Sequence, residues 1–132
     1  MRTGLLAASF VLSLASGAAA QQCLHGDAES PEAAARRREA LMAARVVNTA
    51  QWNQPGARGG RFLTHDALAG QAGNAPPTIT LTPGQDIVPG WRLTLDITPK
   101  GYWFAITDMA DPCGFAFVSN EVGKILKAEV IR

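Results

Sequence analysis

Between Ser30 and Gln51 the chain reads SPEAAARRREALMAARVVNTAQ, and this stretch decides the fold. Ser30 is a good N-cap, Pro31 suits the first helical position, and Glu32 interacts favourably with the positive end of the helix dipole. The segment that follows is rich in alanine, and the sequence N-x-P-G at residues 53–56 is a stop signal. The sequence therefore predicts one long helix that ends near residue 53.

The predicted helix is amphipathic. At the helical period its apolar side holds Ala35, Met42, Ala43, Val46, Val47 and Ala50. Its polar side holds Arg37, Arg38, Arg45 and Asn48. Glu39 is an exception inside the apolar arc, and Arg36, three residues earlier, is a candidate ion-pair partner for it. We expect the Met–Val side to be buried against another element.

Further along the chain the hydrophobic period changes from that of a helix to that of a strand. Ile79 and Leu81 alternate with threonines, which predicts a strand over residues 78–82. Residues 88–91 read VPGW, a strong turn signal. The next strand is predicted over residues 91–98, where one face holds Trp91, Leu93, Leu95 and Ile97.

A second turn at residues 98–101 leads to another alternating segment. Its two sides are Tyr102, Phe104 and Ile106, against Trp103, Ala105 and Thr107. Residues 115–119 and 125–131 complete the predicted strands, with a turn between them. Nearer the helix, Thr64 predicts a capped helical turn over residues 65–69, which Gly70 terminates.

A helix followed by closely spaced strands indicates an α+β domain, because the helix must bury its apolar side against one sheet face. Short connections favour an antiparallel meander. We expect one N-terminal amphipathic helix packed on a C-terminal antiparallel sheet of four to five strands. The whole arrangement forms a single domain over residues 30–132.

Residues 1–20 have the pattern of a cleavable signal peptide. Arg2 supplies the positive charge, residues 5–14 form a short apolar run, and Ala18 and Ala20 make an A-x-A cleavage site before Gln21. The run is too short and too rich in small residues for a membrane anchor, which needs about 20 apolar residues. We expect a periplasmic or secreted protein without a membrane segment after processing. Residues 21–29 are expected to be an exposed, flexible leader.

The chain has two cysteines, Cys23 and Cys113. In an oxidising compartment the default expectation is one disulfide between them, whereas free thiols or pairing with another chain are the alternatives. Neither cysteine belongs to a C-x-x-C redox pair.

The charge balance excludes bulk electrostatic binding. Loss of Arg2 with the signal peptide reduces twelve basic side chains to eleven, which equals the eleven acidic ones. This argues against nucleic acid or anionic lipid as a partner. Positive charge is nevertheless concentrated on the helix at Arg37, Arg38 and Arg45, a candidate binding face for an acidic partner. A solvated helix face is the alternative interpretation.

The layout resembles that of type IV pilins and of the pseudopilins of type II secretion. Residues 43–51, AARVVNTAQ, are similar to the end of a pilin helix, and residues 60–64, GRFLT, to the loop that follows it. Residues 117–125, FVSNEVGKI, resemble the last pilin hairpin. The resemblance implies a pilin-like fold and a protein partner in the cell envelope.

The chain departs from the pilin pattern at its N-terminus. Prepilins carry glutamate at the fifth position after a glycine cleavage site, whereas counting from Gly4 that position here is Ser9. A conventional cleavage site would also remove the segment that inserts into a filament core. We therefore expect a soluble pilin-like domain that is not itself a pilin.

The resemblance also suggests calcium, because some pseudopilins bind it in a C-terminal loop. Asp108 and Asp111 are the corresponding candidate ligands beside Cys113, and a solvated turn is the alternative. His25 with Asp27, and His65 with Asp66, lack the spacing of a zinc site. No nucleophile elbow is present either, so apart from the calcium alternative we expect no metal or cofactor, and we expect no catalysis.

Trp103 lies opposite in phase to its aromatic neighbours, so the predicted sheet has aromatic side chains on both faces. A helix covers one face only, and an exposed aromatic strip would mark a binding surface. Three functions follow as hypotheses. The first is an exported, non-catalytic protein that acts through surface contacts and is associated with a pilus or secretion system. The second is a small ligand-binding module that uses the aromatic sheet face, and the third is a small periplasmic enzyme.

Overall fold

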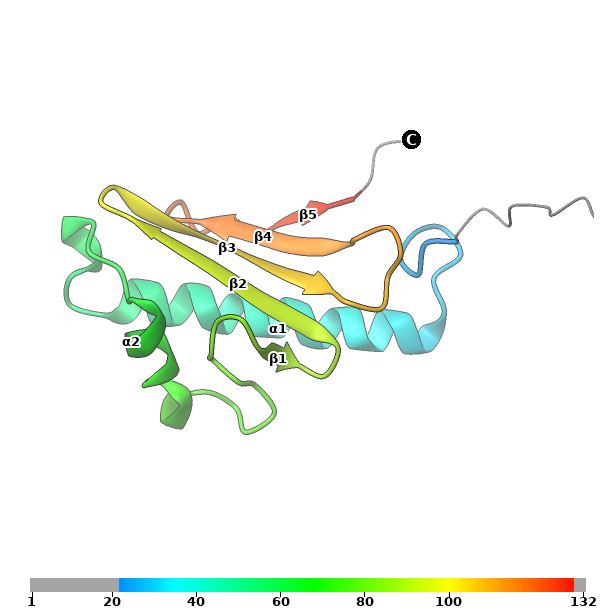
Figure 1. Ribbon diagram of the computed structural model, residues 1–132, viewed down its shortest axis with the longest axis horizontal. Helices are drawn as coiled ribbons and strands as arrows, with labels where there is room; N and C mark the ends of the chain where they lie inside the picture. The colour runs from blue at the N-terminus through cyan, green and yellow to red at the C-terminus, as the bar shows by residue number, and fades with distance from the viewer. Residues whose placement is uncertain (1–21, 130–132) are drawn as a thin grey trace, which may run out of the picture.

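The computed structural model describes residues 22–129 and contains a helix packed on a five-stranded antiparallel sheet (Figure 1). The helical elements are α1 (Pro31–Asn53), η1 (Ala57–Gly59), α2 (His65–Ala69) and η2 (Ala72–Asn74). The strands are β1 (Asp86–Val88), β2 (Trp91–Thr98), β3 (Gly101–Asp108), β4 (Ala116–Asn120) and β5 (Leu126–Ala128). Their order in the sheet is the order in the chain, so the sheet is a simple meander. The α+β prediction is confirmed.

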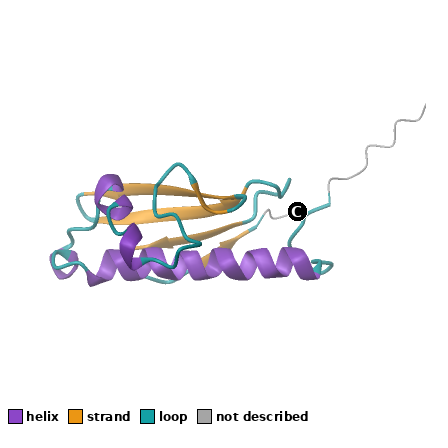
Figure 2. Cartoon of the chain, turned by 90° about the horizontal axis from the view of Figure 1, so that it is seen from below, coloured by secondary structure: helices purple, strands orange, loops and turns teal. Residues whose placement is uncertain are grey.

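Helix α1 runs along one face of the sheet and leaves the other face uncovered (Figure 2). Its start is the predicted one, because the Ser30 hydroxyl accepts a hydrogen bond from the Ala33 amide at 3.1 Å. The Thr64 hydroxyl likewise caps α2. One detail of the prediction is wrong: α1 is not N-terminal, because the described residues 22–30 precede it. The predicted signal peptide, residues 1–20, lies outside the described residues.

The side of α1 that faces the sheet differs from the predicted one. Its buried residues are Ala40, Ala43, Ala44, Val47, Asn48 and Gln51. Met42, expected inside, is 50% exposed, and Asn48, expected outside, is 8% exposed. The buried side is therefore turned by about one residue step, roughly 100°, from the predicted Met–Val side.

The reason is the distribution of side-chain volume between helix and sheet. The sheet contributes the largest core groups, among them Trp91, Tyr102 and Phe104, which are all at most 2% exposed. Small alanines on α1 let the helix approach these rings closely, so the helix needs no large residue at the contact. Arg36 also does not pair with Glu39, because its guanidinium reaches Asp108 instead.

Strands β2 and β3 form the centre of the sheet, with Leu93 opposite Ile106 and Leu95 opposite Phe104. Their alternation is as predicted, and Trp103 projects from the uncovered face with 44% exposure. Gly90 closes the preceding turn with φ +80°, a conformation that favours glycine.

The first predicted strand is wrong. Residues 78–82 are buried at Ile79 and Leu81 but are not a strand, and β1 lies later, over Asp86–Val88. The two aliphatic side chains contribute to the core from an irregular segment, whose Thr80 amide donates a hydrogen bond to the Ile87 carbonyl at 2.8 Å. Alternation alone does not distinguish such a segment from a strand.

The segment before α1 is fastened to the end of the sheet. Cys23 and Cys113 form the predicted disulfide, with Cα atoms 5.3 Å apart. The Leu24 amide donates a hydrogen bond to Asp111 at 3.1 Å, and His25 is only 6% exposed. The expectation of an exposed leader is therefore wrong at His25. Within the described residues, no helix has the length and apolar character needed to cross a membrane.

Candidate functional site

A buried polar cluster joins the segment before α1, the first turns of α1 and the end of β3. His25 Nε2 lies 2.8 Å from Asp108 Oδ2, and His25 Nδ1 lies 2.5 Å from Glu29 Oε1. Both ring nitrogens of His25 therefore lie within hydrogen-bond distance of a carboxylate. The Arg36 guanidinium donates to both oxygens of Asp108 at 2.9 Å. The buried Asp108 carboxylate therefore has a cationic partner in Arg36.

Glu29 extends the cluster toward the surface. Arg37 donates to its two carboxylate oxygens at 2.8 and 2.9 Å, which is the bidentate geometry of a strong ion pair. The hydrogen bond from Arg37, reinforced by the one from His25, lowers the pKa of Glu29 to about 2. The same contact raises the pKa of Arg37.

The geometry of this cluster fits a structural role better than a catalytic one. The His25 side chain is 1% exposed, and its ring packs on Phe115 with centroids 4.5 Å apart. Both ring nitrogens are occupied by carboxylates, so neither is available to a substrate. The contacts connect segments far apart in the chain, and we assign the cluster to fold stability.

The calcium candidates do not fit a cation. Asp108 accepts hydrogen bonds from His25, Arg36 and the Ala110 amide, so hydrogen-bond donors, one of them the Arg36 guanidinium, already occupy its carboxylate. Asp111 Oδ1 accepts from the amides of Leu24 and Cys113. Calcium needs six or more oxygen ligands, and an arginine beside the site opposes it.

The other metal candidates also have different roles. Asp111 lies close to the sulfurs of Cys23 and Cys113, but these form the disulfide and are not thiolate ligands. His25 contacts Asp108 rather than Asp27, and His65 lies 2.7 Å from the Leu95 carbonyl.

The three arginines of the predicted basic face have different environments in the structure. Arg37 pairs with Glu29, as described above, whereas Arg38 and Arg45 are exposed on α1. Within residues 22–129, neither Arg38 nor Arg45 lies within ion-pair distance of a carboxylate. Arg45 is the more interesting of the two because it lines hollows on two sides of α1.

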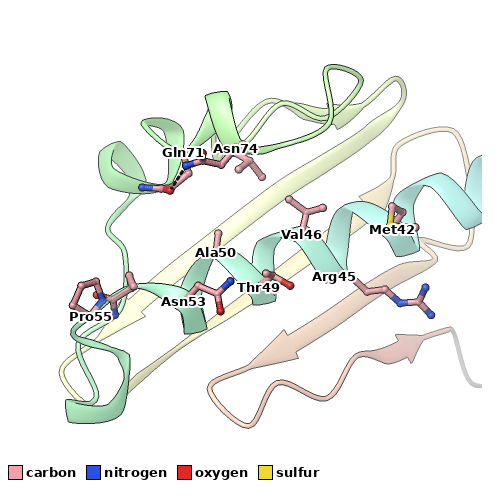
Figure 3. A pocket seen from close by; sticks show the side chains of 11 residues that line it. Met42, Arg45, Val46, Thr49, Ala50, Asn53, Pro55, Gln71 and Asn74 are labelled. Atoms are coloured by element: carbon pink, nitrogen blue, oxygen red, sulfur yellow. Dashed lines mark hydrogen bonds between the residues drawn. The ribbon is translucent and has the colours of Figure 1, made fainter.

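The first of these hollows lies between α1 and the segment that contains η2, and it has a volume of about 530 Å³ (Figure 3). Val46 and Ala50 point from the helix toward the segment that bears Gln71 and Asn74, while Arg45 points away from it. The floor is apolar and the rim carries amides, which is the usual composition of a small-molecule pocket.

A second candidate surface is the sheet face that α1 leaves uncovered. Three large apolar side chains are exposed there: Trp103 at 44%, Val122 at 63% and Leu126 at 60%. Together with Val118 and Lys124 they surround a shallow hollow of about 360 Å³ at the β4–β5 end of the sheet. We call this surface the outer-face patch. Clustered exposed apolar side chains on a small domain mark an interaction surface more often than chance placement does.

The sequence predicts one member of the outer-face patch, Trp103, because it alternates with Tyr102 and Phe104 along β3. Val122 and Leu126 lie in a turn and a short strand, and no periodic signal marks them. Comparisons of the chain with protein-family models, with curated proteins and with solved structures find no match. The resemblance to pilins and pseudopilins therefore stays a prediction from the sequence.

Proposed function

We propose that this chain is an exported, non-catalytic protein of the cell envelope or extracellular space that binds a protein partner through the outer-face patch. The observation that carries the proposal is the exposure of Trp103, Val122 and Leu126 around one hollow on the uncovered sheet face. Aromatic and aliphatic anchors around a central hollow are the usual core of a protein interface.

The charges around the patch indicate the chemistry of the partner. Lys124 is the only charged residue among those that line the hollow within the described chain, and no carboxylate lines it. The partner therefore presents apolar side chains together with an acidic residue close to Lys124. Such a pair at the rim would favour the correct orientation more than it would raise the affinity.

Export is supported by two independent features. Residues 1–20 have the signal-peptide pattern, and the Cys23–Cys113 disulfide fits an oxidising compartment. A pilus or secretion system is the context that the pilin resemblance favours, because a helix laid on an antiparallel meander is the plan shared with those proteins.

The test is site-specific photo-crosslinking in cells that export the protein. A photoreactive phenylalanine analogue replaces Trp103 in one variant and Met42 in a control, because Met42 is similarly exposed but lies on α1. We expect a crosslink from position 103 to one protein, identified by mass spectrometry, which also binds the purified chain. Leu126→Lys should reduce both the crosslink and the binding.

Two results would count against this function. Equal crosslinking from positions 103 and 42 would mean that the patch has no specific partner, and so would no crosslink at all. A crosslinked species of twice the chain mass would show that the patch is occupied by a second copy of this chain instead.

The cavity in Figure 3 favours a second candidate function, the binding of a small and largely apolar molecule. Its volume lies within the usual range for small-ligand sites. Fluorescence titration with anilinonaphthalene sulfonate tests this candidate. Val46→Trp would fill the cavity and should abolish the signal, and an unchanged signal would exclude the cavity.

A further inference from the structure

Strand β5 is the last strand of the sheet, and none of the strands in residues 22–129 pairs with its outer edge. In the described chain it pairs with β4 on one side, with Val118 opposite Leu126 and Phe117 opposite Lys127, and with no strand on the other. Figure 1 shows no described element beyond it. An open edge presents unpaired backbone N–H and C=O groups to any extended segment that approaches it.

The two faces of this edge have different chemistry. The outer face carries the apolar patch around Trp103 and Leu126. On the helix side, a hollow of about 550 Å³ lies between α1 and the β4–β5 hairpin, with an apolar floor that includes Leu41 and Ile125. We call it the basic groove, because its charged lining residues are Arg37, Arg45 and Lys127.

The charged side chains of the basic groove differ in how firmly they are paired. Arg37 is engaged by Glu29, and Lys127 lies 3.0 Å from Glu129 in an ion pair whose two side chains are about half exposed. An exposed pair of this kind contributes little and is easily exchanged for another carboxylate. Arg45 has no ion-pair partner within the described residues, so the groove has a net positive charge.

We propose that the free edge of β5 takes up an extended segment of a partner protein as a sixth strand, and that this segment alternates apolar and acidic residues. This inference rests on the proposed function and specifies the partner. Successive side chains of a strand point to opposite faces. A segment paired with β5 would therefore place every second side chain on the outer-face patch and the others in the basic groove. Backbone hydrogen bonds supply affinity, and the two hollows select the sequence.

The edge is also protected against unselective pairing. Strand β5 has only three residues, and Lys127 lies in its middle. Short edge strands and edge lysines are common devices against aggregation. A segment that brings a carboxylate to Lys127 overcomes this protection, whereas a purely apolar segment or a second basic strand does not.

The test uses a capped heptapeptide, threonine-valine-glutamate-valine-glutamate-valine-threonine, titrated into the purified disulfide-bonded chain and followed by backbone amide NMR. We expect shifts concentrated at residues 126–128 and at the Trp103 indole, with a dissociation constant on the order of 1 mM or tighter. The matching peptide with lysine in place of glutamate should bind at least about tenfold more weakly.

Two variants of the chain test whether peptide binding depends on the charge within the basic groove or only on the net charge of the protein. Arg45→Glu should weaken binding by about fivefold, the effect of one exposed ion pair. Arg58→Glu makes the same change in net charge on η1, outside the groove, and should leave binding within twofold. The dispersion of each NMR spectrum reports that the variant is folded.

Shifts located elsewhere, equal binding of the two peptides, or no shift at millimolar peptide would overturn the inference. A peptide N-methylated on alternate residues should also lose binding if backbone pairing is the mechanism. A partner that crosslinks at position 103 while the heptapeptide leaves β5 unperturbed would preserve the proposed function and reject the sixth strand. If position 103 gives no crosslink and the heptapeptide also leaves β5 unperturbed, the proposed function and the sixth strand are both rejected.

Discussion

The imidazole of His25 and the carboxylate of Asp108 lie 2.8 Å apart although 83 residues separate them in the chain. This contact attaches the segment before α1 to the end of β3, beside the Cys23–Cys113 disulfide. The Asp108 side chain is fully buried, and it also accepts hydrogen bonds from Arg36. A covalent bond and a buried ion-pair cluster therefore hold the same end of the molecule.

Removal of the buried carboxylate should be strongly destabilising. Asp108→Ala removes the acceptor of His25 Nε2 and of Arg36, and each buried donor left without a partner costs about 1–3 kcal/mol. Asp86→Ala is the matched control, since its pair with Arg92 is exposed and worth at most about 1 kcal/mol. Urea unfolding of both variants with the disulfide intact measures the difference. Similar losses in the two variants would show that the buried cluster has no special role.

Stability should fall in acid through Glu29. Its pKa is about 2 in the folded chain, against 4.5 for an unperturbed glutamate side chain, so the unfolded state binds the proton first. The stabilisation is present above pH 4.5 and is lost as the pH falls toward 2. The loss is on the order of 2 kcal/mol, because the side chain lies near the surface and solvent screens the pair. Urea unfolding between pH 2 and 6 measures it.

Glu29→Gln supplies the control for this pH dependence. The variant should be less stable at neutral pH and should show a flatter dependence between pH 4.5 and 2. A wild-type and a variant profile that run parallel across this interval would assign the acid sensitivity to other groups.

Reduction of the disulfide should lower the free energy of unfolding substantially. The bond closes a loop of 90 residues, for which the chain-entropy relation gives about 4.6 kcal/mol. A double variant, Cys23→Ala with Cys113→Ala, should show a comparable loss, and reductant should have no further effect on it. Amide exchange in the same samples should accelerate at Leu24, whose amide bonds to Asp111. Unchanged stability after verified reduction would mean that the polar cluster alone holds this end.

Local signals in the sequence predict α1 and β2 correctly, whereas alternation at residues 78–82 does not produce a strand. The helix cap at Ser30 and the alternation that begins at Trp91 depend on neighbouring residues only, and both appear as predicted. The buried side of α1 depends on what the sheet supplies, and there the prediction failed. The helical period predicts Met42 inside, whereas the structure buries Ala40, Ala43 and Ala44 on α1 and leaves Met42 half exposed.

Long-range hydrogen bonds explain the polar residues that were misplaced or missed. Asn48 is buried because Tyr102 and Ser119 satisfy its amide, and neither partner is near it in sequence. Gln51 is buried for the same reason, since it bonds to the amide and carbonyl of Leu63 at 2.7 and 3.2 Å. The outer-face patch was only partly predictable, because a turn residue such as Val122 follows no period.

The hydrogen bond between Tyr102 and Asn48 can be tested by tyrosine absorbance. The chain contains a single tyrosine, so the whole signal comes from Tyr102. Burial raises the pKa of Tyr102 to about 12, and its hydroxyl donates a hydrogen bond to Asn48 Oδ1 at 2.8 Å. Since the folded pKa lies above the unfolded value near 10, stability is complete below pH 10 and is lost as the pH rises toward 12. Absorbance at about 295 nm should therefore show little tyrosinate at about pH 10–11 in the folded chain, and an immediate rise on unfolding in urea. Asn48→Ala removes the acceptor and should cost about 1–3 kcal/mol, whereas Thr49→Ala, on the exposed side of α1, should cost little. Titration of half the tyrosine near pH 10 in the folded wild-type chain would contradict the buried position of the ring.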